Sequence, residues 1–132
     1  MNNTIQDDTS ISQTPGALGP SNHVEGNYTF ACGAGGNHAE GYGTYSSGGE
    51  GTHAEGYNTY VSGAGGNHAE GYHTHAEGNY GTHAEGYRSM VSGNYGSHAE
   101  GSGTYASGEG THAEGYYTVA TGSAAHAEGK YA

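Results

Sequence analysis

The stretch Gly51-Thr52-His53-Ala54-Glu55-Gly56-Tyr57 decides the fold, because its core, His-Ala-Glu-Gly, returns along the chain at nearly fixed spacing. The copies begin at His38, His53, His68, His75, His83, His98, His112 and His126, and a His-Val-Glu-Gly variant begins at His23. From His23 onward the successive steps are 15, 15, 15, 7, 8, 15, 14 and 14 residues. A sustained period with a half-step of this kind indicates a repeat architecture, in which short units stack on one another.

A finer pattern covers the chain from residue 17 onward, namely a small residue followed two positions later by glycine. In steps of 7 or 8 the small residues are Ala17, Val24, Ala31, Ala39, Ser46, Ala54, Val61, Ala69, Ala76, Ala84, Val91, Ala99, Ala106, Ala113, Ala120 and Ala127. These sixteen half-turns predict an all-β parallel β-roll, or solenoid, of about eight two-strand turns over residues 17–132. Residues 1–16 lack the repeat and are expected to form an N-terminal arm or tail.

The composition is not that of an ordinary domain of 132 residues, since it has 28 glycines, one Phe and no Trp. No conventional hydrophobic core can be built from it, but strict periodicity and 13 tyrosines favour stacked repeats over disorder. The formal net charge is -11, and the only basic side chains are Arg88 and Lys130. We therefore expect no nucleic-acid partner. Without a run of 18 apolar residues or a standard secretion signal, we expect no membrane insertion.

Strand alternation assigns the side chains of each unit. If Ala54 points into the roll, His53 and Glu55 both point away from it. Gly56 is then expected at the corner, where a tight bend or a close approach of backbones needs a residue without a side chain. One outward face then collects the pairs His23/Glu25, His38/Glu40, His53/Glu55, His68/Glu70, His83/Glu85, His98/Glu100, His112/Glu114 and His126/Glu128. The other face collects Phe30/Cys32, Tyr45/Ser47, Tyr60/Ser62, His75/Glu77, Met90/Ser92, Tyr105/Ser107 and Val119/Thr121.

Two further rows recur in register. The first, Tyr42, Tyr57, Tyr72, Tyr87 and Tyr116, follows Glu-Gly and predicts a ladder of rings about 4.8 Å apart; a strip that binds carbohydrate is the alternative. The second comprises Thr44, Thr59, Thr74, Ser89, Thr104 and Thr118. We expect these hydroxyls to lie at corners and to bond the backbone, and an ice-binding row is the alternative.

Segments such as Gly51-Thr52-His53-Ala54-Glu55-Gly56 and Thr104-Tyr105-Ala106-Ser107-Gly108, repeated at this half-step, resemble the YadA-like head repeats of trimeric autotransporter adhesins. The resemblance covers residues 17–132, and its sustained period is more specific than any single motif. It implies a left-handed parallel β-roll that assembles as a homotrimer, with the alanines inside the roll. It also implies an extracellular or cell-surface location.

The nine His-x-Glu pairs contain competent ligands for zinc, copper or nickel. The weak metal candidates are His38, Glu40, His53, Glu55, His68, Glu70, His83, Glu85, His98 and Glu100. Because a site needs further ligands from adjacent turns or subunits, we expect instead a hydrogen-bonded ladder that offsets carboxylate repulsion, with no metal and no cofactor. Rungs that are chemically alike build no unique catalytic pocket, so we expect no enzymatic activity.

The single cysteine, Cys32, is interpreted either as a small buried residue or as a cross-link between subunits. A roll lined by alanine buries little apolar area, so we expect it to associate with copies of itself. The sequence thus predicts a self-assembling structural subunit of an extracellular fibre or filament, which associates as a homotrimer and end to end. The alternative is an adhesin head or a phage-like fibre tip, which acts as a binding module for an extracellular host or matrix ligand.

Overall fold

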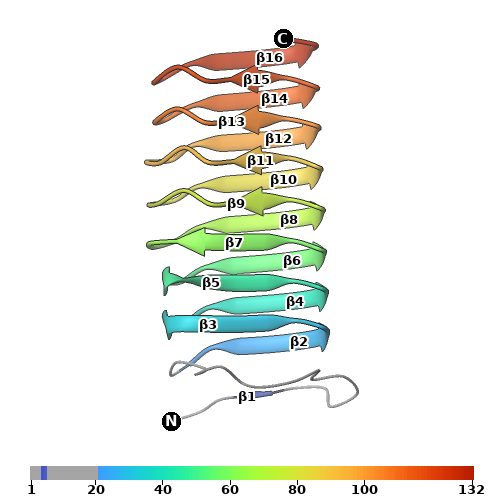
Figure 1. The fold of residues 1–132 in the computed structure, drawn as a ribbon, viewed down its shortest axis with the longest axis vertical. Coiled ribbons are helices and arrows are strands. Elements are labelled where there is room, and N and C mark those ends of the chain that lie inside the picture. Colours follow the sequence, from blue (N-terminus) through green and yellow to red (C-terminus); the bar gives the residue numbers. More distant parts are fainter. Residues whose placement is uncertain (1–3, 6–20) are drawn as a thin grey trace.

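The computed structural model describes residues 4–5 and 21–132, and in them the chain forms an all-β solenoid of parallel strands (Figure 1). The small residue of each unit from Val24 to Ala127 lies in a strand of its own, which gives fifteen strands, β2 to β16. The predicted unit at Ala17 lies outside the described residues, as do most of the arm and its boundary at residue 16. The described chain therefore makes about seven complete turns and one further strand.

Alternate strands form two sheets. Sheet A runs in the order β1, β2, β4, β6, β8, β10, β12, β14, β16. Its strands are β1 (Thr4–Ile5), β2 (His23–Asn27), β4 (His38–Tyr42), β6 (His53–Tyr57), β8 (His68–Tyr72), β10 (His83–Tyr87), β12 (His98–Ser102), β14 (His112–Tyr116) and β16 (His126–Lys130). Sheet B runs from β15 to β3 through the odd-numbered strands. Its strands are β3 (Phe30–Gly35), β5 (Tyr45–Glu50), β7 (Tyr60–Gly63), β9 (His75–Ala76), β11 (Met90–Val91), β13 (Tyr105–Ala106) and β15 (Val119–Ala120).

The register of sheet A places each His-Ala-Glu-Gly copy directly on the next. His53, Ala54, Glu55 and Gly56 of β6 pair with the same residue types in β8, one repeat further along the chain. Steps of 14 residues keep this register as well as steps of 15 do, since β12 pairs with β14 in the same way. The additional residue of a 15-residue step thus lies in a connection between strands. The strands of sheet A, which form the rungs of the roll, remain equivalent.

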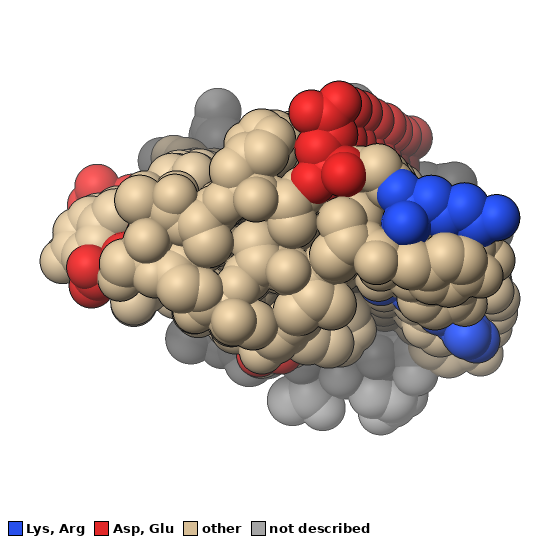
Figure 2. Space-filling view, turned by 90° about the horizontal axis from the view of Figure 1, so that it is seen from above, with Lys and Arg blue, Asp and Glu red and all other residues tan. Residues whose placement is uncertain are grey.

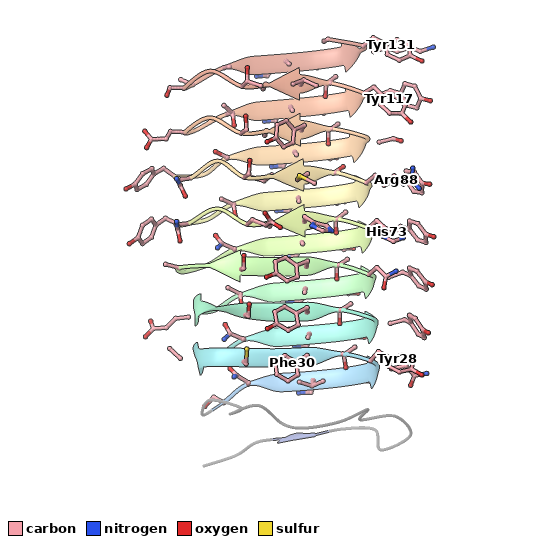
Figure 3. The ribbon with its side chains drawn as sticks, in the orientation of Figure 1. Tyr28, Phe30, His73, Arg88, Tyr117 and Tyr131 are labelled. Atoms are coloured by element: carbon pink, nitrogen blue, oxygen red, sulfur yellow. The ribbon has the colours of Figure 1, made fainter. Side chains whose placement is uncertain are left out.

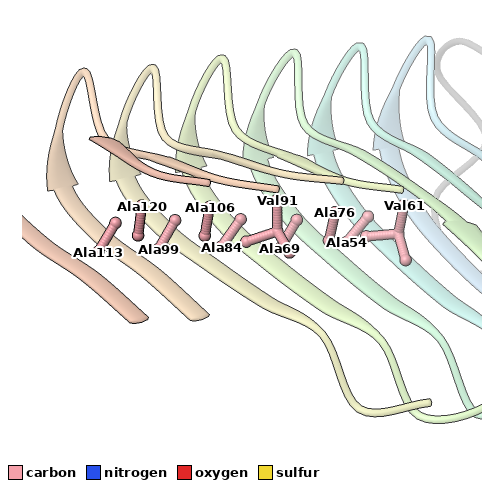
Figure 4. Packing of buried hydrophobic residues seen from close by; sticks show 10 residues of the cluster. All are labelled: Ala54, Val61, Ala69, Ala76, Ala84, Val91, Ala99, Ala106, Ala113 and Ala120. Atoms are coloured by element: carbon pink, nitrogen blue, oxygen red, sulfur yellow. The ribbon is translucent and has the colours of Figure 1, made fainter. Parts of the chain in front are cut away.

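The interior is a single file of small side chains between the two sheets (Figure 4). The fully or almost fully buried apolar residues are Ala31, Ala39, Ala54, Val61, Ala69, Ala76, Ala84, Val91, Ala99, Ala106, Ala113 and Ala120. Ser46 is buried at the equivalent position of β5, whereas Val24 and Ala127, in the outermost full-length strands, are only half-buried. The predicted inward position of the alanines is confirmed.

Glycine follows the buried alanine because the rungs approach closely there. Gly41, Gly56 and Gly71 have φ of 117°, 120° and 121°, and a Cβ on any of them would overlap the carbonyl oxygen of the glycine in the next rung. The sequence predicted a corner at this residue, with a tight bend or a close approach of backbones as the reason for glycine. Gly56 lies inside β6, so the corner is wrong, and the close approach is the reason for glycine.

The arm contributes one described element. β1 pairs in parallel with β2, and Thr4 and Ile5 lie opposite His23 and Val24. This pairing continues the register of sheet A by one short strand below the first His-x-Glu-Gly unit. In the part of the chain that the structure describes, no helix has the length and the apolar character that a membrane crossing requires.

Candidate functional site

The outward face of sheet A carries two parallel rows, one of imidazoles and one of carboxylates, which we call the histidine–glutamate face. Its members are His23, Glu25, His38, Glu40, His53, Glu55, His68, Glu70, His83, Glu85, His98, Glu100, His112, Glu114, His126 and Glu128. Figure 2 shows carboxylates in a row that recedes along one side of the molecule. Strand alternation places both side chains of a pair on this side, as predicted.

The imidazoles stack along the roll. From His23 to His126 the centroids of neighbouring rings lie 4.6 to 4.8 Å apart, with interplanar angles between 3° and 25°. Within each rung the Nε2 atom of the histidine lies 3.3 to 3.7 Å from Oε2 of the glutamate two residues later. Each carboxylate thus has an imidazole near it within its own rung. The predicted hydrogen bond is present in five of the eight rungs, those of His38, His53, His83, His98 and His112.

All ten weak metal candidates lie on this face. They belong to five strands that are neighbours in sheet A, from β4 to β12. Across residues 4–5 and 21–132, no three His, Cys, Asp or Glu side chains converge in a group suited to a metal ion. The face presents instead a line of imidazole–carboxylate pairs. Chemically, such a line accepts protons and attracts cationic or hydrogen-bond-donating partners.

Burial lowers the pKa of His68 below its ordinary value of 6.5, and the neighbouring imidazoles of His83 and His53 lower it further. Burial and His83 lower the pKa of His98 in the same sense. Glu70 and Glu100 act in the opposite direction but are outweighed. Proton uptake is therefore easier in the unfolded chain than in the roll.

This pKa difference predicts that acid destabilises the ladder. A histidine whose pKa is lowered by folding contributes stability that is complete above its unfolded pKa and is lost as the pH falls below 6.5. We expect the free energy of unfolding, measured with urea at pH 8 and at pH 5.5, to fall on acidification. The fall should be smaller in a His68→Gln variant, which has one proton site fewer. An unfolding free energy that does not fall on acidification, or a fall that His68→Gln leaves unchanged, would contradict this assignment.

The outward side of sheet B is different, and we call it the aromatic face. It carries a row of mostly larger side chains, which we call the ridge, and two residues further along each unit a row of mostly smaller ones, which we call the furrow. The ridge comprises Phe30, Tyr45, Tyr60, His75, Met90, Tyr105 and Val119, and the furrow comprises Cys32, Ser47, Ser62, Glu77, Ser92, Ser107 and Thr121. Rings of the ridge stack at 5.2 Å from Phe30 to Tyr45 and at 5.1 Å from Tyr45 to Tyr60. Burial raises the pKa of Tyr45 above its ordinary value of 10.0.

Cys32 belongs to the furrow, where it lies in register with Ser47, and it is half-buried rather than fully buried. Its Sγ atom lies 3.9 Å from the hydroxyl of Tyr45, in the next rung of the ridge. The thiol is free within this chain and faces outward, which leaves a cross-link between subunits as a prediction.

A third row runs along the edge of the roll, where the chain leaves sheet A. Tyr42, Tyr57, Tyr72 and Tyr87 stack with centroids 5.0 to 5.3 Å apart and interplanar angles of 6° or 7°. The predicted ladder of rings is confirmed, and Ser102 interrupts it before Tyr116. Since stacked rings cover one another's faces, the row presents ring edges and hydroxyls to solvent. A sugar that stacks on ring faces therefore has little access to the continuous part of this row.

The residues that turn the chain at this edge add further outward side chains, and Figure 3 shows Tyr28, His73, Arg88, Tyr117 and Tyr131 along it. His73 is half-buried, and the other four are exposed. All five adopt positive φ, between 51° and 59°. The guanidinium of Arg88 lies 5.2 Å from the centroid of the Tyr87 ring. Tyr80 and Tyr95 stack at 5.5 Å near the turns that follow sheet B.

The threonine row is buried, so both interpretations offered for it need correction. Thr44, Thr59, Thr74, Thr104 and Thr118 are at most 1% exposed, and an ice surface cannot reach them in the folded roll. Their Oγ1 atoms have no hydrogen-bond partner, so they do not bond the backbone as predicted. Only Ser89 of this row does so, by donating to the carbonyl oxygen of Gly101 at 3.2 Å.

An unpartnered buried hydroxyl costs free energy, which makes Thr59 a site for stabilisation. We expect Thr59→Val to raise the free energy of unfolding by about 1 kcal/mol, because valine has the same shape without the hydroxyl. The matched control is Thr111→Val, at another buried threonine whose Oγ1 donates to the carbonyl oxygen of Gly108 at 3.0 Å. That change should instead lower the stability by about 1 kcal/mol. Urea unfolding checks both, and equal effects would refute the distinction.

Sequence reasoning missed a second buried polar row, just before each histidine of sheet A. It consists of Asn22, Asn37, Thr52, Asn67, Thr82, Ser97 and Thr111. Asn37 shows its use: Oδ1 accepts from the backbone N–H of Thr52 at 3.0 Å, and Nδ2 donates to the carbonyl oxygen of Cys32 at 2.8 Å. These amides hold successive rungs together at the turn from sheet B to sheet A. The signal was present, since each residue stands two positions before a small inward residue.

Comparison of the chain with protein-family models, with curated proteins and with solved structures finds no match.

Proposed function

We propose that this chain is a structural, self-assembling subunit of an extracellular or cell-surface fibre, in which rolls associate as a homotrimer and stack end to end. The observation that carries the proposal is the equivalence of the rungs. Every sheet A strand from β2 to β16 pairs with its neighbour in one parallel register. A second copy placed on an end of the roll meets the same row of backbone donors and acceptors that the rungs offer one another.

The core supports association as well. Twelve alanine and valine side chains form the buried apolar set, and the larger apolar side chains lie on the outside. The roll therefore buries little apolar area by itself and gains more by covering its outer faces. Lateral association and end-to-end stacking use different surfaces, so the two modes are compatible in one fibre.

The arm fits the same proposal. β1 already occupies the outer edge of β2, so an arriving roll meets β1 at that end. The arm would then act as the joint between successive rolls. It would extend the register of sheet A from one subunit into the next.

A binding module is the second candidate, and the exposed aromatic side chains favour it. Tyr28, Tyr80, Tyr95 and Tyr131 are 57%, 57%, 60% and 68% exposed, which is unusual for rings that serve only the packing of one chain. In this role the chain would be an adhesin head or a fibre tip. Its rows of rings and carboxylates would contact an extracellular host or matrix ligand.

Mass measurement combined with negative-stain electron microscopy of the purified protein separates the candidates. Filaments much longer than one roll support the fibre subunit. Short, discrete trimers support the binding module, and a monomeric mass without filaments at all concentrations contradicts both.

A further inference from the structure

The two broad faces of the roll differ in how readily they meet another copy. The histidine–glutamate face has one carboxylate in each of its eight full-length strands, so two such faces would repel one another at neutral pH. The ridge and furrow of the aromatic face contain one carboxylate, Glu77. Self-association through the aromatic face therefore brings far less charge together.

The aromatic face also carries exposed apolar side chains that a second copy can cover. Its ridge and furrow residues stand at positions i and i+2; both lie in the strand in β3, β5 and β7, whereas in β9, β11, β13 and β15 the furrow residue directly follows the strand. Met90 and Val119 of the ridge are 38% and 51% exposed, although they are apolar. The furrow is lined mainly by serine. A second roll that lies parallel to the first can set its larger side chains against this row of smaller ones, and the contact repeats from rung to rung.

The rung at β9 differs from the other rungs of the aromatic face in both the ridge and the furrow. At β9 the ridge carries His75 and the furrow carries Glu77, whose Nδ1 and Oε1 atoms lie 3.5 Å apart. The neighbouring furrow residues, Ser62 and Ser92, are uncharged. Of the seven rungs on the aromatic face, this is the one with an imidazole and a carboxylate, and it is the fourth.

We propose that the aromatic face is the surface at which parallel copies of this chain meet, ridge over furrow, and that His75 and Glu77 fix their axial register. The inference rests on the proposed self-association and names its surface. In register, His75 of one copy lies beside Glu77 of the next. A slip of one rung would place Glu77 against a tyrosine or a methionine of the second copy and leave its carboxylate covered, with only the imidazole of its own chain as a partner. The other residues of the ridge and furrow are uncharged, so this rung is the one charged landmark along the axis of this face.

Few side chains surround the His75–Glu77 pair on the aromatic face. Within the chain, His75 follows Tyr60 and precedes Met90 along the ridge, and its ring lies 5.8 Å from that of Tyr60. Glu77 stands between Ser62 and Ser92 in the furrow. No further charged side chain belongs to the ridge or the furrow as defined above, so the imidazole is the natural partner of the carboxylate within a chain and between copies.

Charge insertion tests the surface. Tyr60→Glu places a carboxylate on the ridge, and we expect the concentration for half-assembly, measured by light scattering after size-exclusion chromatography, to rise at least about tenfold. The matched control is Tyr57→Glu, which puts the same change on the tyrosine row at the edge and should leave assembly unchanged. Circular dichroism and urea unfolding identify any loss of folding in either variant.

Cysteine pairing provides a second readout that does not depend on a destabilising change. In a Cys32→Ser background, equal amounts of Tyr60→Cys and Ser62→Cys chains are mixed and oxidised, and we expect covalent heterodimers. A mixture of Tyr60→Cys with Ser92→Cys, two rungs away, should give none. When His75→Tyr and Glu77→Ser are added to every chain, pairing between Tyr60→Cys and Ser47→Cys, one rung apart, should increase several-fold as copies slip.

The outcomes separate the inference from the proposal on which it rests. A parent protein that stays monomeric refutes the proposed assembly and the inference with it. A parent that assembles, while Tyr60→Glu has no effect and Glu55→Cys chains on the histidine–glutamate face cross-link to one another, refutes the inference alone. Cross-linking through the aromatic face with unchanged register in the His75→Tyr/Glu77→Ser background refutes the role of the pair.

Discussion

Replacing Gly56 with alanine is expected to destroy the roll, or to lower its free energy of unfolding by at least about 3 kcal/mol. Gly56 has a φ of 120°, which an L side chain rarely adopts, and its new Cβ would overlap the carbonyl oxygen of Gly71. The clash is with backbone, so no rotamer relieves it, and the two rungs must separate. Ladder hydrogen bonds between β6 and β8 would be lost as a result. Urea unfolding followed by circular dichroism measures the effect.

The control for this change is Gly66→Ala. Gly66 also has a positive φ, 65°, but no heavy atom lies within 4 Å of the position of its Cβ. We expect a cost of about 1 kcal/mol from the left-handed backbone alone. If the two substitutions destabilise equally, the close approach of rungs at Gly56 is not what requires glycine there.

Replacing Ala84 with leucine is the second change with a large expected effect. Ala84 is fully buried in β10, in the single file of small side chains between the sheets, and Figure 4 shows Val91 beside it. Three additional carbons have no room unless the sheets move apart, so we expect a loss of about 3 kcal/mol or non-native association. The control is Glu109→Leu at an exposed turn, which should change stability by no more than about 0.5 kcal/mol.

A paired exchange shows whether volume is the cause. Ala84→Val and Val91→Ala should each destabilise the roll, the first by overpacking and the second by leaving a cavity. Combined in one chain they conserve the volume of the interior at this level. The double variant should therefore be more stable than the sum of the two losses predicts, by about 0.5 kcal/mol or more. Simple additivity would mean that the two positions do not share space.

The part of the fold that follows from strand alternation was predictable from the sequence. A step of 7 or 8 residues gave the strands, and the small residue of each unit, such as Ala54, gave the inward position. His53 and Glu55 then had to lie outside, and stacking in register produced the ladders of imidazoles, carboxylates and tyrosine rings. These predictions needed only the sequence of one repeat and the assumption that the next repeat stacks on it in register.

The threonine row was predicted wrongly because strand alternation was not extended to the residue two positions before each small residue. Thr59 stands two positions before the buried Val61, so its side chain also points inward. The same holds for Asn37 and Ala39 on the other sheet. The threonine row was instead expected at corners. Threonine and asparagine are common in turns, and this preference was given more weight than their spacing from the small residues. Burial of six threonine hydroxyls without partners is also a cost that few proteins accept, so type alone could not predict it.

What lay beyond the sequence was the difference between the outer surfaces. Alternation sorts side chains into faces, but how far the ring of Tyr57 covers the ring of Tyr72 depends on their rotamers and on the close approach of rungs that Gly56 allows. The half-buried position of Cys32 likewise follows from the Tyr45 ring of the next rung. These surface details decide which face is suited to another copy and which to solvent.

The proposal that rolls stack end to end is tested most directly by the diffraction of the assembled protein. In such a fibre the strands lie across the long axis and the rungs follow one another along it, about 4.8 Å apart. Power spectra from electron micrographs of single filaments should then show a 4.8 Å layer line on the meridian, parallel to the filament axis. A 4.8 Å reflection perpendicular to that axis, or protein that forms no filaments at all, would contradict the account.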